Sequence, residues 1–230
     1  PNAIRDGKTA IQSEQSRTAV RFENRRFRRF NNITQLISFS DNLPYISGQG
    51  QQKQGSFYCS NAFSKTKFNA FKEEREEELI YSIRSLGEEE IDAVLKDVNR
   101  FALKSQPEFR TNQDPSIPCN TFISSLYQKE RLLFLLRYGL AYVEEHSKDG
   151  TIQLQKHVMR YPQFFATKAI EDAIGKGVKK GVIWHTQGSG KTALSYFNIR
   201  YLTNYFSKQE IVPQFYFVVD RLDLADQATR

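Results

Sequence analysis

The amino-acid sequence predicts an α/β fold whose last third begins a doubly wound parallel sheet. Three observations lead to this prediction. Apolar residues recur at helical spacing over 164–173, and two short apolar runs follow at 182–184 and 214–219. A second amphipathic segment lies between these runs, and a third begins after residue 220. Such an alternation of helices and apolar strands is typical of a parallel sheet covered by helices.

Composition places the chain among folded proteins. Hydrophobic residues make up 39% of its 230 residues, with 18 Phe and 11 Tyr, which is enough for a core. The net charge of +7 favours a polyanionic partner. No apolar run has the length of a membrane span and no signal peptide opens the chain, so we expect a cytoplasmic protein without membrane contact. Cys59 and Cys119 are expected to be reduced core residues.

The N-terminal segment is rich in arginine. On a helix, spacings of four, four and three residues place four guanidinium groups in one stripe, namely those of Arg17, Arg21, Arg25 and Arg28. The stripe has two interpretations: a surface that contacts nucleic-acid phosphates, or a solvated helix face of the kind that most charged stripes form. Both interpretations stay open at this point.

The middle of the chain predicts a small sheet followed by helices. Runs of β-forming residues predict strands at 33–39, 43–47 and 56–59. Helical periodicity predicts helices at 72–86, with its charged side exposed, at 88–101 and at 122–138. Ser85 and Glu88 fit a capping box for the second of these. Residues 105–121, with three prolines, are expected to form a linker or a crossing loop. Residues 139–143 fit a helix extension or a strand, and 150–155 fit an edge strand or a turn.

The stretch from Gly181 to Thr192 carries the chemistry. An apolar run, a turn of small residues and then Lys-Thr at the start of a helix match the phosphate loop G-x-x-x-x-G-K-[ST] from Gly190 onward. His185 stands where the first glycine of that Walker A pattern belongs. In such a loop, backbone N–H groups at a helix N-terminus hold a polyphosphate, Lys191 reaches the β- and γ-phosphates, and the Thr192 hydroxyl ligates Mg²⁺.

The loop by itself leaves several readings open. It fits an ATP-driven enzyme, a kinase or GTPase-like switch, or a nucleic-acid-binding module whose loop does not hydrolyse nucleotide. A chance Gly-Ser-Gly turn before a lysine is the remaining reading. Asp220 fits either a helix cap or part of a functional motif after the second apolar run.

Three stretches together resemble a known family. They are Arg160-Tyr161-Pro162-Gln163, the residues from Ile183 to Thr192, and the residues from Phe217 to Leu224. In these the chain resembles the R subunit, the motor and nuclease subunit, of type I restriction enzymes, within the superfamily 2 helicase-like translocases. The resemblance covers roughly the last third of the chain, and weaker similarity reaches back to Pro118-Cys119-Asn120. In this family a histidine at the position of His185 is usual.

The resemblance implies roles for individual residues. It assigns adenine recognition to Gln163, with Arg160 beside it, and ATP binding to the loop residues Thr186, Gln187, Gly188, Ser189, Gly190, Lys191 and Thr192. Thr192 would hold Mg²⁺ through the bound ATP, and Arg221 would lie near the DNA backbone. The implied partners are double-stranded DNA and the methyltransferase and specificity subunits of a restriction complex.

The resemblance also implies a domain layout. Residues 1–104 would be the C-terminal part of a nuclease-like α/β domain, residues 105–155 a linker and helical connector, and residues 156–230 the N-terminal part of the first RecA-like motor domain. The chain is expected to be a fragment spanning the nuclease–motor junction. The acidic run that activates water and the Asp…Glu-x-Lys nuclease centre are not found in it. We therefore expect both catalytic centres to be incomplete and the fragment to be inactive.

Overall fold

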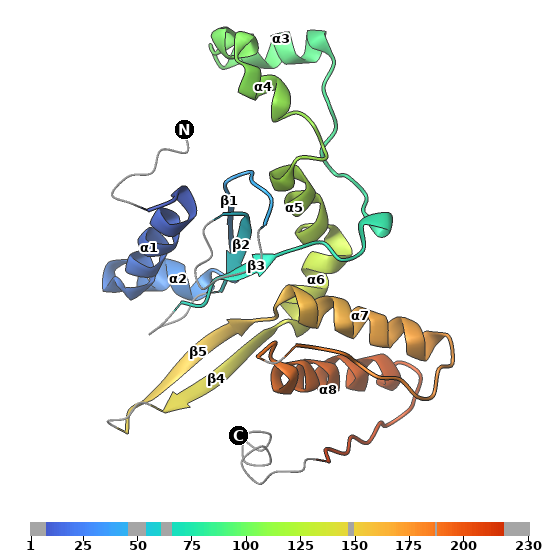
Figure 1. The fold of residues 1–230 in the computed structure, drawn as a ribbon. Helices are drawn as coiled ribbons and strands as arrows, with labels where there is room; N and C mark the ends of the chain where they lie inside the picture. Colours follow the sequence, from blue (N-terminus) through green and yellow to red (C-terminus); the bar gives the residue numbers. More distant parts are fainter. Residues whose placement is uncertain (1–7, 46–53, 61–65, 147–149, 187, 219–230) are drawn as a thin grey trace.

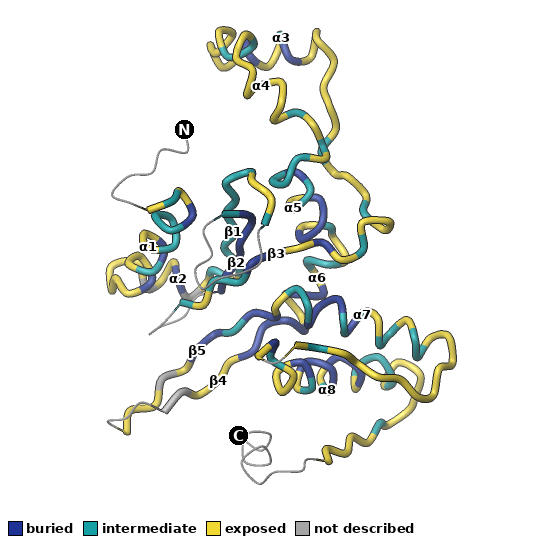
Figure 2. Tube along the Cα trace, in the orientation of Figure 1, coloured by how far each residue is buried: buried dark blue, intermediate teal, exposed yellow. Residues whose placement is uncertain are grey.

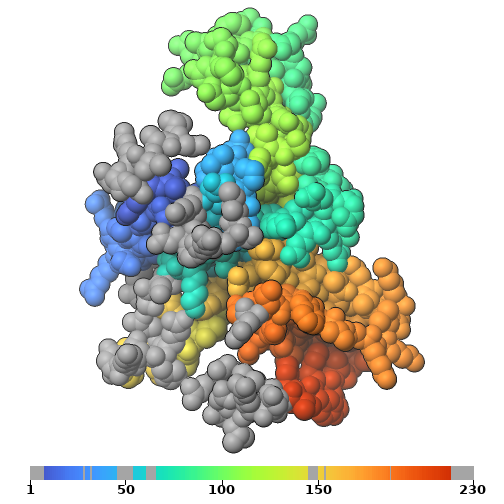
Figure 3. All heavy atoms as spheres, viewed as in Figure 1, coloured from blue at the N-terminus to red at the C-terminus, as the bar shows by residue number. Residues whose placement is uncertain are grey.

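The computed structural model describes residues 8–45, 54–60, 66–146, 150–186 and 188–218. It is a mixed α/β structure with two small antiparallel sheets, which confirms the α/β class (Figure 1). The three-stranded sheet lies in the middle of the molecule, beside the N-terminal helices. The helices α3 and α4 protrude at one end, and the β4–β5 hairpin with α7 and α8 forms the other end (Figures 1 and 3).

The N-terminal segment forms two helices instead of one. They are joined by a short 3-10 turn: α1 (Ala10–Glu23), η1 (Arg25–Phe27) and α2 (Arg28–Ile33). The backbone of Asn24 is extended and ends α1, and its side chain accepts a hydrogen bond from the Arg26 N–H at 2.9 Å. Buried Asn31 donates to the carbonyl of Arg21 at 2.9 Å and so holds α2 against α1. The prediction of one continuous arginine stripe is therefore wrong.

The central sheet has the order β1-β2-β3. Its strands are β1 (Ile37–Ser40), β2 (Ser56–Cys59) and β3 (Asn69–Phe71), all antiparallel. The predicted strand at 56–59 is confirmed. The strand predicted at 33–39 begins only at Ile37 in the structure and ends at Ser40. Residues 43–45 form no strand, and 46–47 lie outside the described residues. Burial raises the pKa of the Cys59 thiol to about 12, as expected for a reduced core cysteine.

The helices after the sheet differ from the prediction. They are η2 (Glu76–Glu78), α3 (Glu88–Asp97), η3 (Phe101–Ser105), α4 (Pro107–Thr111), α5 (Pro118–Leu126) and α6 (Lys129–Tyr138). The single helix predicted over 122–138 is wrong, because two helices separated at Tyr127 and Gln128 form there. The helix predicted over 72–86 is wrong, because Ser82 donates its backbone N–H to Ser124 of α5 at 3.1 Å and this segment runs extended. The capping residue of α3 is Gly87, whose N–H donates to Glu90 at 3.0 Å, so the Ser85–Glu88 box is also wrong.

The C-terminal part combines a hairpin with two long helices. Strands β4 (Leu140–His146) and β5 (Ile152–Val158) pair in antiparallel register, and α7 (Tyr161–Gly175) and α8 (Lys191–Ser207) pack on each other. Both helices were predicted. The main core joins side chains of β2, β3, α5, α6, α7 and α8, and Figure 2 shows this buried band where β5 meets α7.

The two apolar runs that flank α8 form no strands. Val182 is 90% exposed and Trp184 is 91% exposed, and Val218 is 95% exposed in the second run. The predicted parallel sheet is therefore not formed among the described residues. A parallel strand needs hydrogen bonds from neighbouring strands, and no described strand lies beside either run.

No helix in the described ranges is long and apolar enough to cross a membrane.

Candidate nucleotide-binding site

The candidate site is built where α8 begins. Gly190, the capping residue of α8, has the left-handed backbone conformation (φ 83°), and Gly188 has it as well (φ 74°). Glycine adopts these angles without steric cost, which lets the chain turn tightly into the helix. The first helical hydrogen bond runs from the Leu194 N–H to the Gly190 carbonyl at 2.9 Å. The N–H groups of residues 191–193 precede this bond and have no acceptor within the helix, so they lie at its positive end.

Gln163 connects this loop to α7. Its side chain is in the first turn of α7, and the residue is only 3% exposed. The amide Nε2 donates to the carbonyl of Gly190 at 2.9 Å, and the amide Oε1 accepts the N–H of Arg160 at 2.8 Å. One amide therefore caps α7 and fixes the capping residue of α8. In this conformation little of the amide is left for a ligand.

Arg160 provides a second link to the loop. Its guanidinium Nη1 donates to the carbonyl of Gly188 at 3.3 Å. Arg160 and Gln163, which lie 30 and 27 positions before Gly190, are thus brought to the loop by the fold. Gln187, between Thr186 and Gly188, lies outside the described residues.

The reactive side chains of the loop are open to solvent. Lys191 and Thr192 are both exposed at the start of α8, and their side chains form no hydrogen bond or ion pair with a described residue. Ser189 is buried, and its hydroxyl has no hydrogen-bond partner in the described part of the chain. The Lys191 ammonium, the Thr192 hydroxyl and the unpaired N–H groups at a helix N-terminus are the donor set that a Mg²⁺-bound triphosphate needs. The residues present therefore fit ATP and Mg²⁺.

The segment after β3 carries the carboxyl of Glu74. Desolvation raises the pKa of the Glu74 carboxyl, and the charges of Lys72 and His185 act against that shift.

A buried cluster next to this segment was not predicted from the sequence. Glu73 pairs with Arg131 at 2.6 Å, and both contact the hydroxyl of Ser125. The sequence indicated only a charged, exposed run over 72–78. The alternation of burial within that run depends on its contacts with α5 and α6, which local periodicity does not encode.

The predicted DNA-contacting arginines separate into two groups. Arg17 and Arg21 on α1 share the carboxylate of Glu14, at 3.2 and 3.8 Å. Arg25 lies in η1 with Arg26, and neither forms an ion pair with a described residue. The side chain of Arg28 and the whole of Arg221, with Asp220, lie outside what the structure describes.

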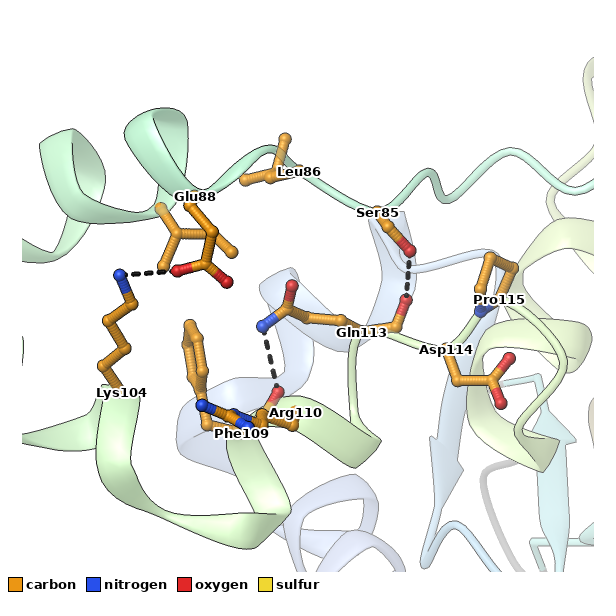
Figure 4. A pocket seen from close by; sticks show the side chains of 10 residues that line it. Ser85, Leu86, Glu88, Lys104, Phe109, Arg110, Gln113, Asp114 and Pro115 are labelled. Atoms are coloured by element: carbon orange, nitrogen blue, oxygen red, sulfur yellow. Dashed lines mark hydrogen bonds and ion pairs between the residues drawn. The ribbon is translucent and has the colours of Figure 1, made fainter.

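The hollow in Figure 4 lies away from the loop. It has a volume of about 480 Å³ and is lined by residues of α3, η3, α4 and the segments beside them, including Glu88, Lys104 and Arg110. None of its lining residues belongs to α7, α8 or the loop. In the described part of the chain, no group of three His, Cys, Asp or Glu side chains is arranged to hold a metal ion.

Comparison with known proteins gives one family match and one relative. Residues 162–230, which include the loop and α8, match the family model described as SWI2/SNF2 ATPase. The chain is also 43% identical over 104 residues to the putative type I restriction enzyme MjaVIIP endonuclease subunit of Methanocaldococcus jannaschii. The chain is similar to a type I restriction endonuclease subunit. The resemblance read from the residues is thereby confirmed.

The extent of these matches is partial. The alignment to the Methanocaldococcus subunit covers 42% of this chain and 9% of that protein. The matched part of the chain thus spans about a tenth of the length of this relative. No solved structure matches the chain.

The Gln163–Gly190 contact makes a prediction about the two loop glycines. A Cβ at residue 190 would lie 2.5 Å from the Gln163 Nε2, whereas a Cβ at residue 188 would meet nothing within 4 Å. Both substitutions by alanine carry the left-handed cost of about 1 kcal/mol. Gly190→Ala should also displace the buried Gln163 amide and lower the free energy of unfolding by about 1 kcal/mol more. Urea denaturation of the two variants measures this difference; equal losses would contradict the contact.

Proposed function

We propose that the chain is part of an ATP-dependent DNA translocase and endonuclease subunit of a type I restriction–modification system, and that residues 160–192 hold its ATP. The observation that carries the proposal is the Gln163 amide bound to the carbonyl of Gly190. It joins the two sequence motifs that the resemblance names, and it does so beside an exposed lysine at a helix N-terminus. The similarity to an endonuclease subunit and to an ATPase family supports the same assignment.

In this proposal each loop residue has a specific task. The N–H groups at the start of α8 and the ammonium of Lys191 bind the phosphates, and the Thr192 hydroxyl ligates the Mg²⁺ that accompanies them. The adenine ring binds beside Arg160 and Gln163. The Gln163 amide is almost fully buried in the described conformation. To recognise the adenine, it either turns toward the ligand or uses the donor and acceptor positions that its two hydrogen bonds leave open.

The exposed apolar runs fit a motor domain larger than the described part. Residues 182–184 and 214–218 would become strands of a RecA-like parallel sheet once neighbouring strands pair with them. In the same layout, residues 1–104 are the end of a nuclease-like domain and residues 105–155 the connector. The water-activating and nuclease groups would come from other parts of the subunit, so this chain binds nucleotide and does not turn it over.

The remaining partners follow from the proposed restriction complex. The substrate is double-stranded DNA, and the methyltransferase and specificity subunits are the protein partners. The setting is the cytoplasm, without membrane contact. The DNA sequence is read by the specificity subunit in this proposal, so no base-reading element is expected here.

The lysine of the loop provides the direct test of ATP binding. Lys191→Ala should weaken binding of a fluorescent ATP analogue with Mg²⁺ at least tenfold, because the ammonium neutralises phosphate charge. Lys208→Ala is the matched control, since Lys208 caps the opposite end of the same helix and should leave affinity unchanged. Equal binding by the parent chain and Lys191→Ala would refute the assignment of the loop.

The α1–α2 region is the proposed DNA contact. Arg25, Arg26 and Arg29 form no ion pair with described residues, and the helices that carry them lie along one edge of the face in Figure 3. Replacing these three by Gln should weaken binding to a DNA duplex and reduce the slope of log K against log salt by about two to three.

Arg17→Gln with Arg21→Gln is the control for that measurement. Because Glu14 already neutralises part of their charge, this change should have the smaller effect on both affinity and slope. A larger effect from the α1 pair, or no effect from either set of substitutions, would contradict a DNA contact at the junction of α1 and α2.

A further inference from the structure

A buried charged cluster lies directly behind the turn of α7 that carries Gln163. Its members come from three elements: Glu73 after β3, Ser125 on α5 and Arg131 on α6. The side chain of Glu73 is 3% exposed and that of Arg131 is 11% exposed. Burial of an ion pair costs free energy unless its hydrogen-bonding groups are satisfied. The hydrogen bonds of this cluster therefore decide whether the pair is stable where it lies.

The polar groups of the cluster are well satisfied. The Glu73 Oε2 accepts from the Arg131 Nη1 at 2.6 Å, and that nitrogen lies 2.7 Å from the Ser125 hydroxyl. The other carboxylate oxygen, Oε1, accepts the backbone N–H groups of Glu74 and Arg75 at 3.1 and 2.8 Å. The carboxylate therefore fixes the backbone after β3 as well as the arginine of α6.

The arginine also contacts α7. Its guanidinium carbon lies 5.4 Å from the ring centroid of Phe165 and 6.0 Å from that of Phe164. These rings directly follow Gln163 in the first turn of α7, and both are buried. A guanidinium over aromatic faces restrains their orientation, and the attraction is stronger when the groups are desolvated.

The same segment holds α7 near its other end. Arg75, two residues after Glu73, pairs with Asp172 at 2.8 Å. The backbone after β3 is thus connected to the first turn of α7 through Arg131 and to the last turns through Arg75. The Tyr58 hydroxyl of β2 adds a buried hydrogen bond to the carbonyl of Met159, one residue before Arg160, at 2.7 Å.

We propose that Glu73, Ser125 and Arg131 are positioning residues that set the first turn of α7, and with it Arg160 and Gln163, against the nucleotide loop. In this way the central sheet is mechanically coupled to the loop. A nucleotide that moves Gln163 would shift the rings of Phe164 and Phe165, and the shift would reach the end of β3 through Arg131. The effect on nucleotide affinity rests on the proposed function, whereas the effect on the α7 turn does not.

The test replaces the charges without leaving one of them unpaired. In Glu73→Gln with Arg131→Met, the new amide can still accept the two N–H groups and donate to Ser125, and the methionine fills the space of the arginine stem. The variant is expected to fold. Lys168→Met is the matched control, because it removes a cation from over Phe134 and Tyr201 in the same core without touching Glu73.

Hydrogen exchange of single amides reports the positioning directly. The Arg160 N–H is held by the Gln163 side chain, so its exchange should rise about tenfold in the double variant, with that of Phe164, and stay unchanged in Lys168→Met. ATP-analogue affinity should fall about tenfold in the double variant only. Unchanged exchange at Arg160, or a uniform rise along the whole chain, would overturn the proposal. If the parent chain binds no nucleotide, the proposed function fails while the exchange result still decides the positioning role.

Discussion

The hydrogen bond from the Gln163 amide to the carbonyl of Gly190 is the contact on which the candidate site depends. It is made between the first turn of one helix and the capping residue of the next, so it fixes the distance between two segments that the sequence separates by 27 residues. Gly190 allows the contact because a side chain there would collide with the amide. Gln163, and not Lys191 or Thr192, makes the hydrogen bond that holds the loop. The side chains of Lys191 and Thr192 are therefore left free for a ligand.

This contact is supported from the central sheet. The cluster of Glu73, Ser125 and Arg131 packs against the rings next to Gln163, and Arg75 holds the far end of the same helix. The sheet and the helices α7 and α8 that flank the loop are therefore parts of one packed core. If the chain spans a junction between a nuclease-like unit and a motor, as we propose, the junction has direct contacts through which the two could influence each other.

The sequence predicted the local features of the site well and its long-range contacts poorly. Gly188, Gly190 and the helix start at Lys191 follow from turn chemistry and spacing, which are local, whereas Arg160 and Gln163 were assigned from the family resemblance. The burial of Glu73 could not be predicted, because it depends on α5 and α6. The helix predicted over 72–86 failed for the same reason, since Ser82 bonds to α5. The segments 182–184 and 214–218 have the composition of strands but form none, because no described strand lies beside them. A neighbouring strand cannot be predicted from the composition of the segment itself.

The ability of the Gln163 amide to serve both the loop and the nucleotide is the central claim, and calorimetric titration of ATP and GTP measures it most directly. The parent chain should prefer ATP over GTP. Gln163→Leu, which retains volume and removes the amide, should bind ATP about tenfold more weakly, a loss of about 1.4 kcal/mol, and should lose the preference. An unchanged ATP affinity with an unchanged preference in Gln163→Leu would contradict the account and leave Gln163 as a helix cap alone.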